Sequence, residues 1–179
     1  ILCQIKRRQM TREQFEQFLK ANEYVIDDIC MEAWKLHESF GQWYDKSLPY
    51  GNHLSMVADD AMKYGHHVLP DEQDIISVIF GAFFHNSIED ARQSYNDVRR
   101  IAEKYMTPDK AVMAAEIVYA LTNEKGRTRQ ERAGERYYAG IRETPYAPFV
   151  KLCDRFANMT FSSTGKNQHN HHMHMVYAS

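Results

Sequence analysis

Apolar residues recur along the chain at the three- and four-residue intervals of helices, in segments broken by glycine, proline and polar residues. Residues 11–14 have the capping-box pattern that opens a helix, and Phe15, Phe18 and Leu19 follow at helical spacing. No segment alternates apolar and polar positions convincingly over the length of a strand. We therefore expect an all-α protein built as a helical bundle.

Further helices are expected between these breaks, and residues 41–51, with two glycines and a proline, are expected to form a loop. The expected helices cover residues 25–40, 53–65, 70–84, 95–105, 107–121, 130–142 and 148–159. The segment 130–142 is highly charged and is expected to be exposed. The last helix carries a stripe of Val150, Cys153 and Ala157 that is expected to be buried.

The most informative segment is the run of residues 75–84, which is apolar at nearly every position and is typical of a buried helix. It ends abruptly at His85 and Asn86, with Glu89 and Asp90 one turn later. Polar groups left unpaired at the end of a buried helix cost on the order of 1–3 kcal/mol each. These side chains therefore require partners, which either a metal ion with its water or a hydrogen-bond network would supply.

Composition narrows the classes of partner. The chain has 179 residues, 44% of them hydrophobic, and a formal net charge of −2, which fits one domain with a substantial core. No overall basic charge would attract nucleic acid or an anionic membrane. No apolar run reaches the roughly 18 residues of a membrane span. We expect neither partner, whereas a phosphorylated small molecule is compatible, because a pocket can be basic within a near-neutral protein.

The cysteines and the first residues bear on compartment and boundaries. Cys3, Cys30 and Cys153 are odd in number, far apart and without a CxxC pair, which argues against a disulfide framework and favours a reducing, cytoplasmic compartment. Residues 1–10 lack the apolar centre of a signal peptide, and the chain does not begin with Met. We expect residues 1–10 to be a non-native or flexible segment and residues 11–179 to form one domain, with room for a missing C-terminal part.

Three separated segments carry residues suited to one metal site. PYGNH at residues 49–53 brings His53 to the start of a helix, the second segment contains His85, and KLCDRFANM at 151–159 places Asp154 and Asn158 on one helical face. Two imidazoles and a carboxylate suit Mn, Fe or Zn and leave positions for water and substrate. Taken singly, each has an ordinary explanation as a core histidine, a solvated acidic turn or a structural ion pair. Their joint order and spacing favour the metal site.

These segments resemble the motifs of the HD-domain phosphohydrolases, most closely the (p)ppGpp hydrolase domain of RelA/SpoT homologues and their small single-domain relatives. The matching segments are PYGNH, FFHNSIEDA and KLCDRFANM, and the resemblance covers residues 22–179. It implies an HD-domain helical bundle with Mn²⁺ as the cofactor. The implied reaction is hydrolytic release of pyrophosphate from the ribose 3′ position of a guanosine tetra- or pentaphosphate.

The resemblance also implies roles for individual residues. Positions that hold the metal in the family are occupied here by His53, His85, Asn86 and Asp154. The acidic pair that orients or activates the attacking water corresponds to Glu89 and Asp90. Asn158 falls near the nucleotide ribose, and Tyr177 falls near a nucleotide-contacting tyrosine.

Asn86 departs from the family, which has Asp at this position. A neutral amide oxygen is a weaker ligand for a hard divalent ion than a carboxylate, so metal affinity and water activation should both fall. Three interpretations follow. The protein is a natural, catalytically impaired binder, the asparagine was introduced to trap a complex, or the metal is held by three protein ligands plus water.

The loop before His53 also departs from the family, which commonly has an Arg-Lys pair whose arginine stacks on the base. Residues 42–46 are Gln-Trp-Tyr-Asp-Lys instead. Trp43 or Tyr44 would stack on a base or pack over the bundle, and Lys46 would meet a phosphate. Further basic candidates for phosphate binding are Lys151 and Arg155, with Lys125, Arg127 and Arg129 on a loop.

Two questions have more than one answer in the sequence, namely the role of a histidine cluster near the C-terminus and the identity of the substrate. His169, His171, His172 and His174 indicate either a second metal site or an exposed helical face or lid. The function classes are a hydrolase of (p)ppGpp-like alarmones, a hydrolase of another phosphorylated nucleotide such as NADPH at its 2′-phosphate, and a non-catalytic nucleotide sensor. The chain is too short to hold an additional synthetase domain.

Overall fold

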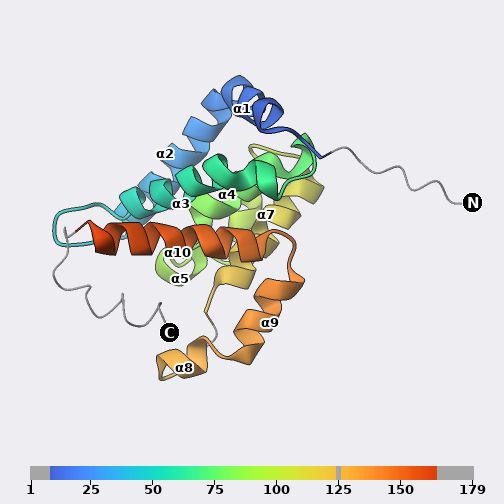
Figure 1. Cartoon of the computed structure of the whole chain (residues 1–179). Helices are drawn as coiled ribbons and strands as arrows, with labels where there is room; N and C mark the ends of the chain where they lie inside the picture. The colour runs from blue at the N-terminus through green and yellow to red at the C-terminus, as the bar shows by residue number, and fades with distance from the viewer. Residues whose placement is uncertain (1–8, 124–125, 165–179) are drawn as a thin grey trace, which may run out of the picture.

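The computed structural model describes residues 9–123 and 126–164, and within these ranges the regular secondary structure is helical (Figure 1). The helices are α1 (Arg12–Ala21), α2 (Glu23–Ser39), α3 (Gly51–Tyr64), η1 (Gly65–His67), η2 (Glu72–Asp74), α4 (Ile75–Phe84), α5 (Ser87–Asp90), α6 (Tyr95–Ala102), α7 (Pro108–Leu121), α8 (Arg129–Arg132), α9 (Glu135–Glu143) and α10 (Ala147–Ser163). The expected all-α class is confirmed. No helix in the described ranges combines the length and apolar character needed to cross a membrane.

Helix α4 lies at the centre of the bundle, with α2, α3, α7 and α10 packed against it (Figure 1). Nine of its ten residues are buried, as its uninterrupted apolar sequence predicts. Gly81 lets α7 approach closely, because an added Cβ would lie only 2.7 Å from Cγ2 of Ile117. The dense packing on every side fixes the end of α4, where His85 follows.

Helix α10 packs most extensively on α3 and presents Val150, Cys153, Ala157 and Phe161 to the core. It starts after Tyr146, whose backbone is left-handed with φ of 64°. The Tyr146 hydroxyl donates a hydrogen bond of 2.8 Å to Oδ2 of Asp74, directly before α4. This bond fastens the start of α10 to the start of α4, and the two helices thereby hold their functional residues in a fixed relation.

The expectation for residues 130–142 is wrong in two respects. The segment forms two helices, α8 and α9, because the chain leaves the helical conformation at Ala133 and extended Gly134. It is also partly buried, since Tyr137 and Ile141 belong to the core and the Tyr137 hydroxyl donates to the carbonyl of Leu121 at 3.1 Å. Tyr137 and Ile141 are four residues apart and therefore lie on one helical face, but the many charged residues around them make the segment look exposed in the sequence.

Other helix boundaries shift by a turn. The buried helix begins at Ile75 instead of Pro70, because the Asp71 carboxylate accepts a hydrogen bond from the N–H of Gln73 and closes the short turn η2. The last helix runs to Ser163, four residues beyond the expected end. The capping box at Thr11 and Gln14 is present as predicted.

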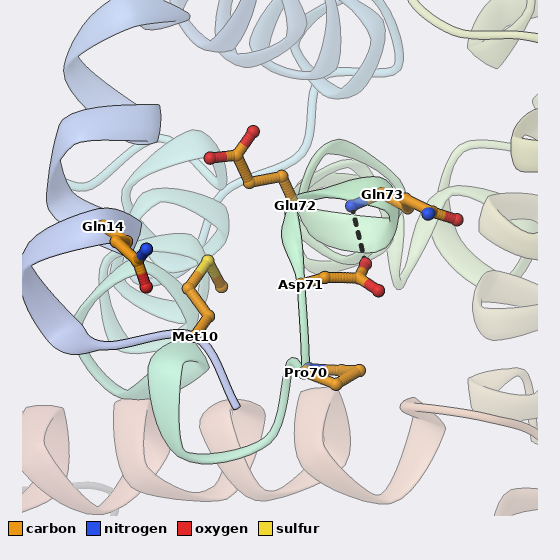
Figure 2. A pocket seen from close by; sticks show the side chains of 6 residues that line it. All are labelled: Met10, Gln14, Pro70, Asp71, Glu72 and Gln73. Atoms are coloured by element: carbon orange, nitrogen blue, oxygen red, sulfur yellow. Dashed lines mark hydrogen bonds between the residues drawn. The ribbon is translucent and has the colours of Figure 1, made fainter. Parts of the chain in front are cut away.

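The first described residues pack against the fold. Met10 is only 8% exposed, and its N–H donates to the carbonyl of Pro70 at 2.9 Å. Figure 2 shows a pocket here, with Met10 and Gln14 on one side and residues 70–73 on the other. The described residues that line this pocket include none of those predicted for the metal site. Residues 1–8 lie outside the described ranges.

Candidate metal centre

His53, His85 and Asp154 meet inside the bundle, although they come from three different helical segments. His53 lies in the first turn of α3, His85 ends α4, and Asp154 lies midway along α10. The two Nε2 atoms are 3.2 Å apart, and Oδ1 of Asp154 lies 3.3 Å from Nε2 of His53 and 3.7 Å from Nε2 of His85. All three residues are buried. The convergence predicted from the three motifs is therefore present.

Hydrogen bonding and burial leave His85 neutral and Asp154 ionised, so both residues present electron-pair donors to the middle of this cluster. The carbonyl oxygen of Ala82 lies 2.7 Å from Nδ1 of His85, so Nδ1 carries the proton and Nε2 presents its lone pair. Burial lowers the pKa of His85 to about 4, which keeps its ring neutral at physiological pH. Burial alone would raise the pKa of Asp154, but the hydrogen bond from His53 and the positive charge of Lys151 oppose it, and that pKa is held below its usual range.

These donors fit a divalent cation. Two imidazole nitrogens and a carboxylate oxygen lie within 4.8 Å of one another, and such a mixture suits first-row ions such as Mn, Fe and Zn. Ligand atoms about 2.1 Å from a tetrahedral ion are separated by about 3.4 Å, and the three observed separations lie close to this value. Nδ1 of His53 is buried without a hydrogen-bond partner among the described residues, whereas Nε2 faces two acceptors, Nε2 of His85 and Oδ1 of Asp154, so without a cation the ring proton lies on Nε2.

A layer of polar side chains holds Asp154 in place. Lys151 Nζ donates to Oδ2 of Asp154 at 2.9 Å, and Asn158 Nδ2 donates to Oδ1 at 2.8 Å. The Tyr44 hydroxyl donates to Oδ1 of Asn158 at 2.9 Å, while the Tyr44 ring stacks on His53 with 4.8 Å between centroids. Tyr44, Lys151 and Asn158, which the sequence suggested as substrate contacts, thus also orient the cluster.

Asn86 and Asp90 are joined through Tyr50. Asn86 Nδ2 donates to the Tyr50 hydroxyl at 2.5 Å, and that hydroxyl donates to Oδ2 of Asp90 at 2.9 Å. Burial raises the pKa of Asp90. Glu89 faces elsewhere, because its carboxylate accepts from the side-chain amide of Asn123 at 2.7 Å. The two acidic residues therefore occupy different environments. Asp90 is linked to the cluster by Tyr50, whose hydroxyl it binds and whose ring contacts His53.

Two polar residues behind Tyr50 were not identified from the sequence. His37 is 1% exposed, stacks on the Tyr50 ring at 4.9 Å, and lies 2.6 Å from Oε1 of Gln42 through its Nδ1. Gln42 in turn donates its amide to the carbonyl of Asp90. The helical spacing of the sequence does indicate that His37 is buried, because His37 continues the buried face of Ile26, Ile29 and Ala33 along α2.

A positively charged pocket of about 250 Å³ adjoins the cluster at Asp154. Its basic side chains are Arg129, Arg132, Lys151 and Arg155, and its other lining residues are Asn123, Ala133, Tyr137, Tyr138 and Asp154. Burial would lower the pKa of Lys151, but the neighbouring Asp154 carboxylate raises it overall, so the ammonium stays charged. Arg132 was missed from the sequence, because its place in the pocket depends on the break between α8 and α9.

The remaining predicted contacts lie farther from this chemistry or outside the described residues. Trp43 is 61% exposed and lines a small pocket of about 140 Å³ with Trp34, Pro49 and Tyr50. Lys46 is exposed on the same loop. Of the residues singled out in the sequence, those that lie outside the described ranges are Lys125, His169, His171, His172, His174 and Tyr177.

Comparison of the chain with family models, with curated proteins and with solved structures finds no match.

Proposed function

We propose that the protein is a metal-dependent phosphohydrolase that acts on a phosphorylated nucleotide. The observation that carries this proposal is the shared position of Asp154, which belongs both to the cluster of cation donors and to the wall of the basic pocket. A cation site next to an anion-binding pocket is the arrangement needed to hold a phosphate ester beside a water molecule.

His53, His85 and Asp154 would hold the divalent ion, and Mn²⁺ is the proposed one because of the motif resemblance. When bound, the ion would lower the pKa of a coordinated water and offset negative charge on the phosphoryl group. Asn86 would add at most a weak, neutral ligand. The partly buried carboxylate of Asp90, whose pKa is raised by this burial, is the proposed acceptor of a proton from the attacking water.

The basic pocket would bind the phosphate groups of the substrate. Arg129, Arg132 and Arg155 carry planar guanidinium groups, which bind phosphate oxygens in pairs. Lys151 already donates to Asp154, so it would share its remaining hydrogens with the substrate. Bringing a phosphate into this pocket also places it next to the proposed cation.

Within this class, the motif resemblance favours the 3′-pyrophosphate of a (p)ppGpp-like alarmone as the scissile group, in the cytoplasm. A second substrate class keeps the same site but releases orthophosphate, for example from the 2′-phosphate of NADPH. The nature of the released product, pyrophosphate or orthophosphate, distinguishes the two.

A second candidate function is nucleotide binding without catalysis. It is favoured by Asn86, which brings one negative charge fewer than an aspartate to the cluster. It is also favoured by the hydrogen bonds that Asn123 makes to Glu89. Both features weaken the activation of water while leaving the basic pocket intact.

The test is Mn²⁺ binding followed by a screen of phosphorylated nucleotides with the native chain and with Asn86→Asp. We expect both proteins to bind Mn²⁺ and Asn86→Asp to raise Mn²⁺-dependent turnover by orders of magnitude. His85→Ala should abolish both properties, whereas replacement of exposed His67 by alanine should change neither. Binding of nucleotide without turnover in every variant would favour the sensor, and absence of Mn²⁺ binding would refute the metal centre.

A further inference from the structure

Tyr50 occupies a bridging position whose hydrogen bonds have a defined direction. Its hydroxyl has one proton to donate, and it lies between Asn86 Nδ2 at 2.5 Å and Asp90 Oδ2 at 2.9 Å. The ring is fixed on both sides, stacked on buried His37 and set edge-on to His53 with 5.6 Å between centroids. The hydroxyl is therefore held beside the cluster of cation donors.

The Tyr50 hydroxyl donates its proton to the carboxylate of Asp90. A carboxylate accepts hydrogen bonds and donates none, so the Tyr50 proton points to Asp90. The Tyr50 oxygen is then left as an acceptor toward position 86. Asn86 can satisfy this acceptor only with its NH₂ group, since its carbonyl oxygen has no hydrogen to offer. The direction of one bond thus dictates the direction of the next.

We infer that Tyr50 is a positioning residue that turns the amide of Asn86 so that its oxygen, and not its nitrogen, is the end offered as a neutral ligand to a cation at His53, His85 and Asp154. An amide has one ligating end and one end that repels cations, so its orientation matters. In this arrangement Asn86 is a working part of the site, held by Tyr50 and Asp90. This inference rests on the proposed metal centre.

The inference distinguishes an amide from a carboxylate at position 86. A carboxylate has oxygen at both ends and cannot be presented the wrong way round. Loss of the Tyr50 hydroxyl should therefore weaken cation binding when residue 86 is asparagine, and should matter little when it is aspartate. A purely structural role of Tyr50 would affect both proteins alike.

The experiment is a double-mutant cycle of Tyr50→Phe and Asn86→Asp, with the dissociation constant for Mn²⁺ measured by titration calorimetry on the full chain. Phenylalanine keeps the ring that stacks on His37 and removes only the hydroxyl. We expect Tyr50→Phe to weaken Mn²⁺ binding about 10-fold beside Asn86, the size seen when groups that orient ligands are removed. Beside Asn86→Asp the change should be about 2-fold or less.

The control variant is Tyr105→Phe, which removes another tyrosine hydroxyl bonded to a carboxylate, that of Glu32, and should leave Mn²⁺ affinity unchanged. Equal loss of affinity in both backgrounds, or no loss beside Asn86, would overturn the inference while leaving the metal centre in place. If none of the proteins binds Mn²⁺, including Asn86→Asp, the proposed centre itself fails and the inference falls with it. Circular dichroism on each variant reports whether the fold is retained.

Discussion

The Nε2 atoms of His53 and His85 lie 3.2 Å apart, at the separation of a hydrogen bond, with Oδ1 of Asp154 within 3.7 Å of both. Two neutral imidazoles cannot face each other in this way with both lone pairs unshared, so a proton or a cation must lie between them. In the metal-free protein the ring proton of His53 fills this place. A further proton would have to go on His85, where burial disfavours it and where it would remove the lone pair that a metal needs, so acid should oppose both folding and metal binding.

The stability of the metal-free protein should fall on mild acidification. Burial lowers the pKa of His85 from 6.5 to about 4, so below pH 6.5 the unfolded chain binds a proton that the folded chain excludes. Stability is therefore fully present above the unfolded pKa and is lost as the pH falls toward the folded pKa. The expected loss between about pH 7 and pH 5 is about 2 kcal/mol, measured by urea unfolding in the presence of EDTA.

The control for this pH dependence is His85→Gln, which lacks the titrating ring and should show a shallower slope of stability against pH. Burial also lowers the pKa of His37, which adds to the slope in the same direction and should survive in the variant. An unchanged slope in His85→Gln would show that His85 is not the group that resists protonation.

Removal of the Asp154 carboxylate should cost both stability and metal binding. Asp154→Asn leaves the largely buried ammonium of Lys151 without its charged partner, at an expected cost of about 2 kcal/mol. Asp74→Asn is the matched control, because Asp74 pairs with Lys110 at similar burial. Both variants should unfold at lower urea concentration, but only Asp154→Asn should lose the additional stability that Mn²⁺ confers. Retention of that stabilisation by Asp154→Asn would contradict the ligand role.

The basic pocket should bind inorganic pyrophosphate through its arginines. Replacement of Arg132 by glutamine removes one guanidinium from the pocket wall and should weaken pyrophosphate binding roughly 3- to 10-fold. Arg100→Gln removes an exposed arginine paired with Asp97 on α6 and should have no effect. Calorimetric titration at low and high salt is the measurement, and the difference should shrink in high salt because exposed charges are screened. Equal affinities at low salt would exclude Arg132 from the binding site.

Gly51 should be intolerant of a side chain. An added Cβ would lie 2.1 Å from a ring carbon of Trp34, so Gly51→Ala should destabilise the protein by roughly 1–3 kcal/mol and disturb the turn that carries His53. Gly140→Ala in α9 meets nothing within 4 Å and should stabilise it by about 0.4–1 kcal/mol. Denaturant unfolding compares the two. Relief of the Gly51→Ala defect by Trp34→Leu would identify the clash as its cause, whereas persistence would point to the backbone.

The sequence was sufficient for those features that depend on strong local patterns. The apolar run of α4 has no polar face, so its burial and the burial of His85 at its end follow directly. The separation of Asp154 and Asn158 by four residues placed both on one face of α10, where the observed hydrogen bond joins them. The proximity of His53 and His85 could be predicted only from the order of the motifs, because the two residues are 32 positions apart and no local pattern relates them.

The features that were missed depend on packing between segments. No local pattern shows that Glu89 faces Asn123 while Asp90 faces Tyr50, because that difference arises from which helix each carboxylate meets. Likewise, Tyr137 lies among charged residues in the sequence. It is buried because it packs against the end of α7, where its hydroxyl donates to the carbonyl of Leu121.

Helix α10 keeps its scaffolding residues and its chemical residues on separate faces, with Val150, Cys153 and Ala157 inward and Lys151, Asp154 and Asn158 toward the polar site. Substitutions in the second set would therefore change the chemistry of the site and lower stability, but they would leave the apolar contacts of the first set in place. The arrangement of the helices and the chemistry at their meeting point thus depend on different residues of one helix.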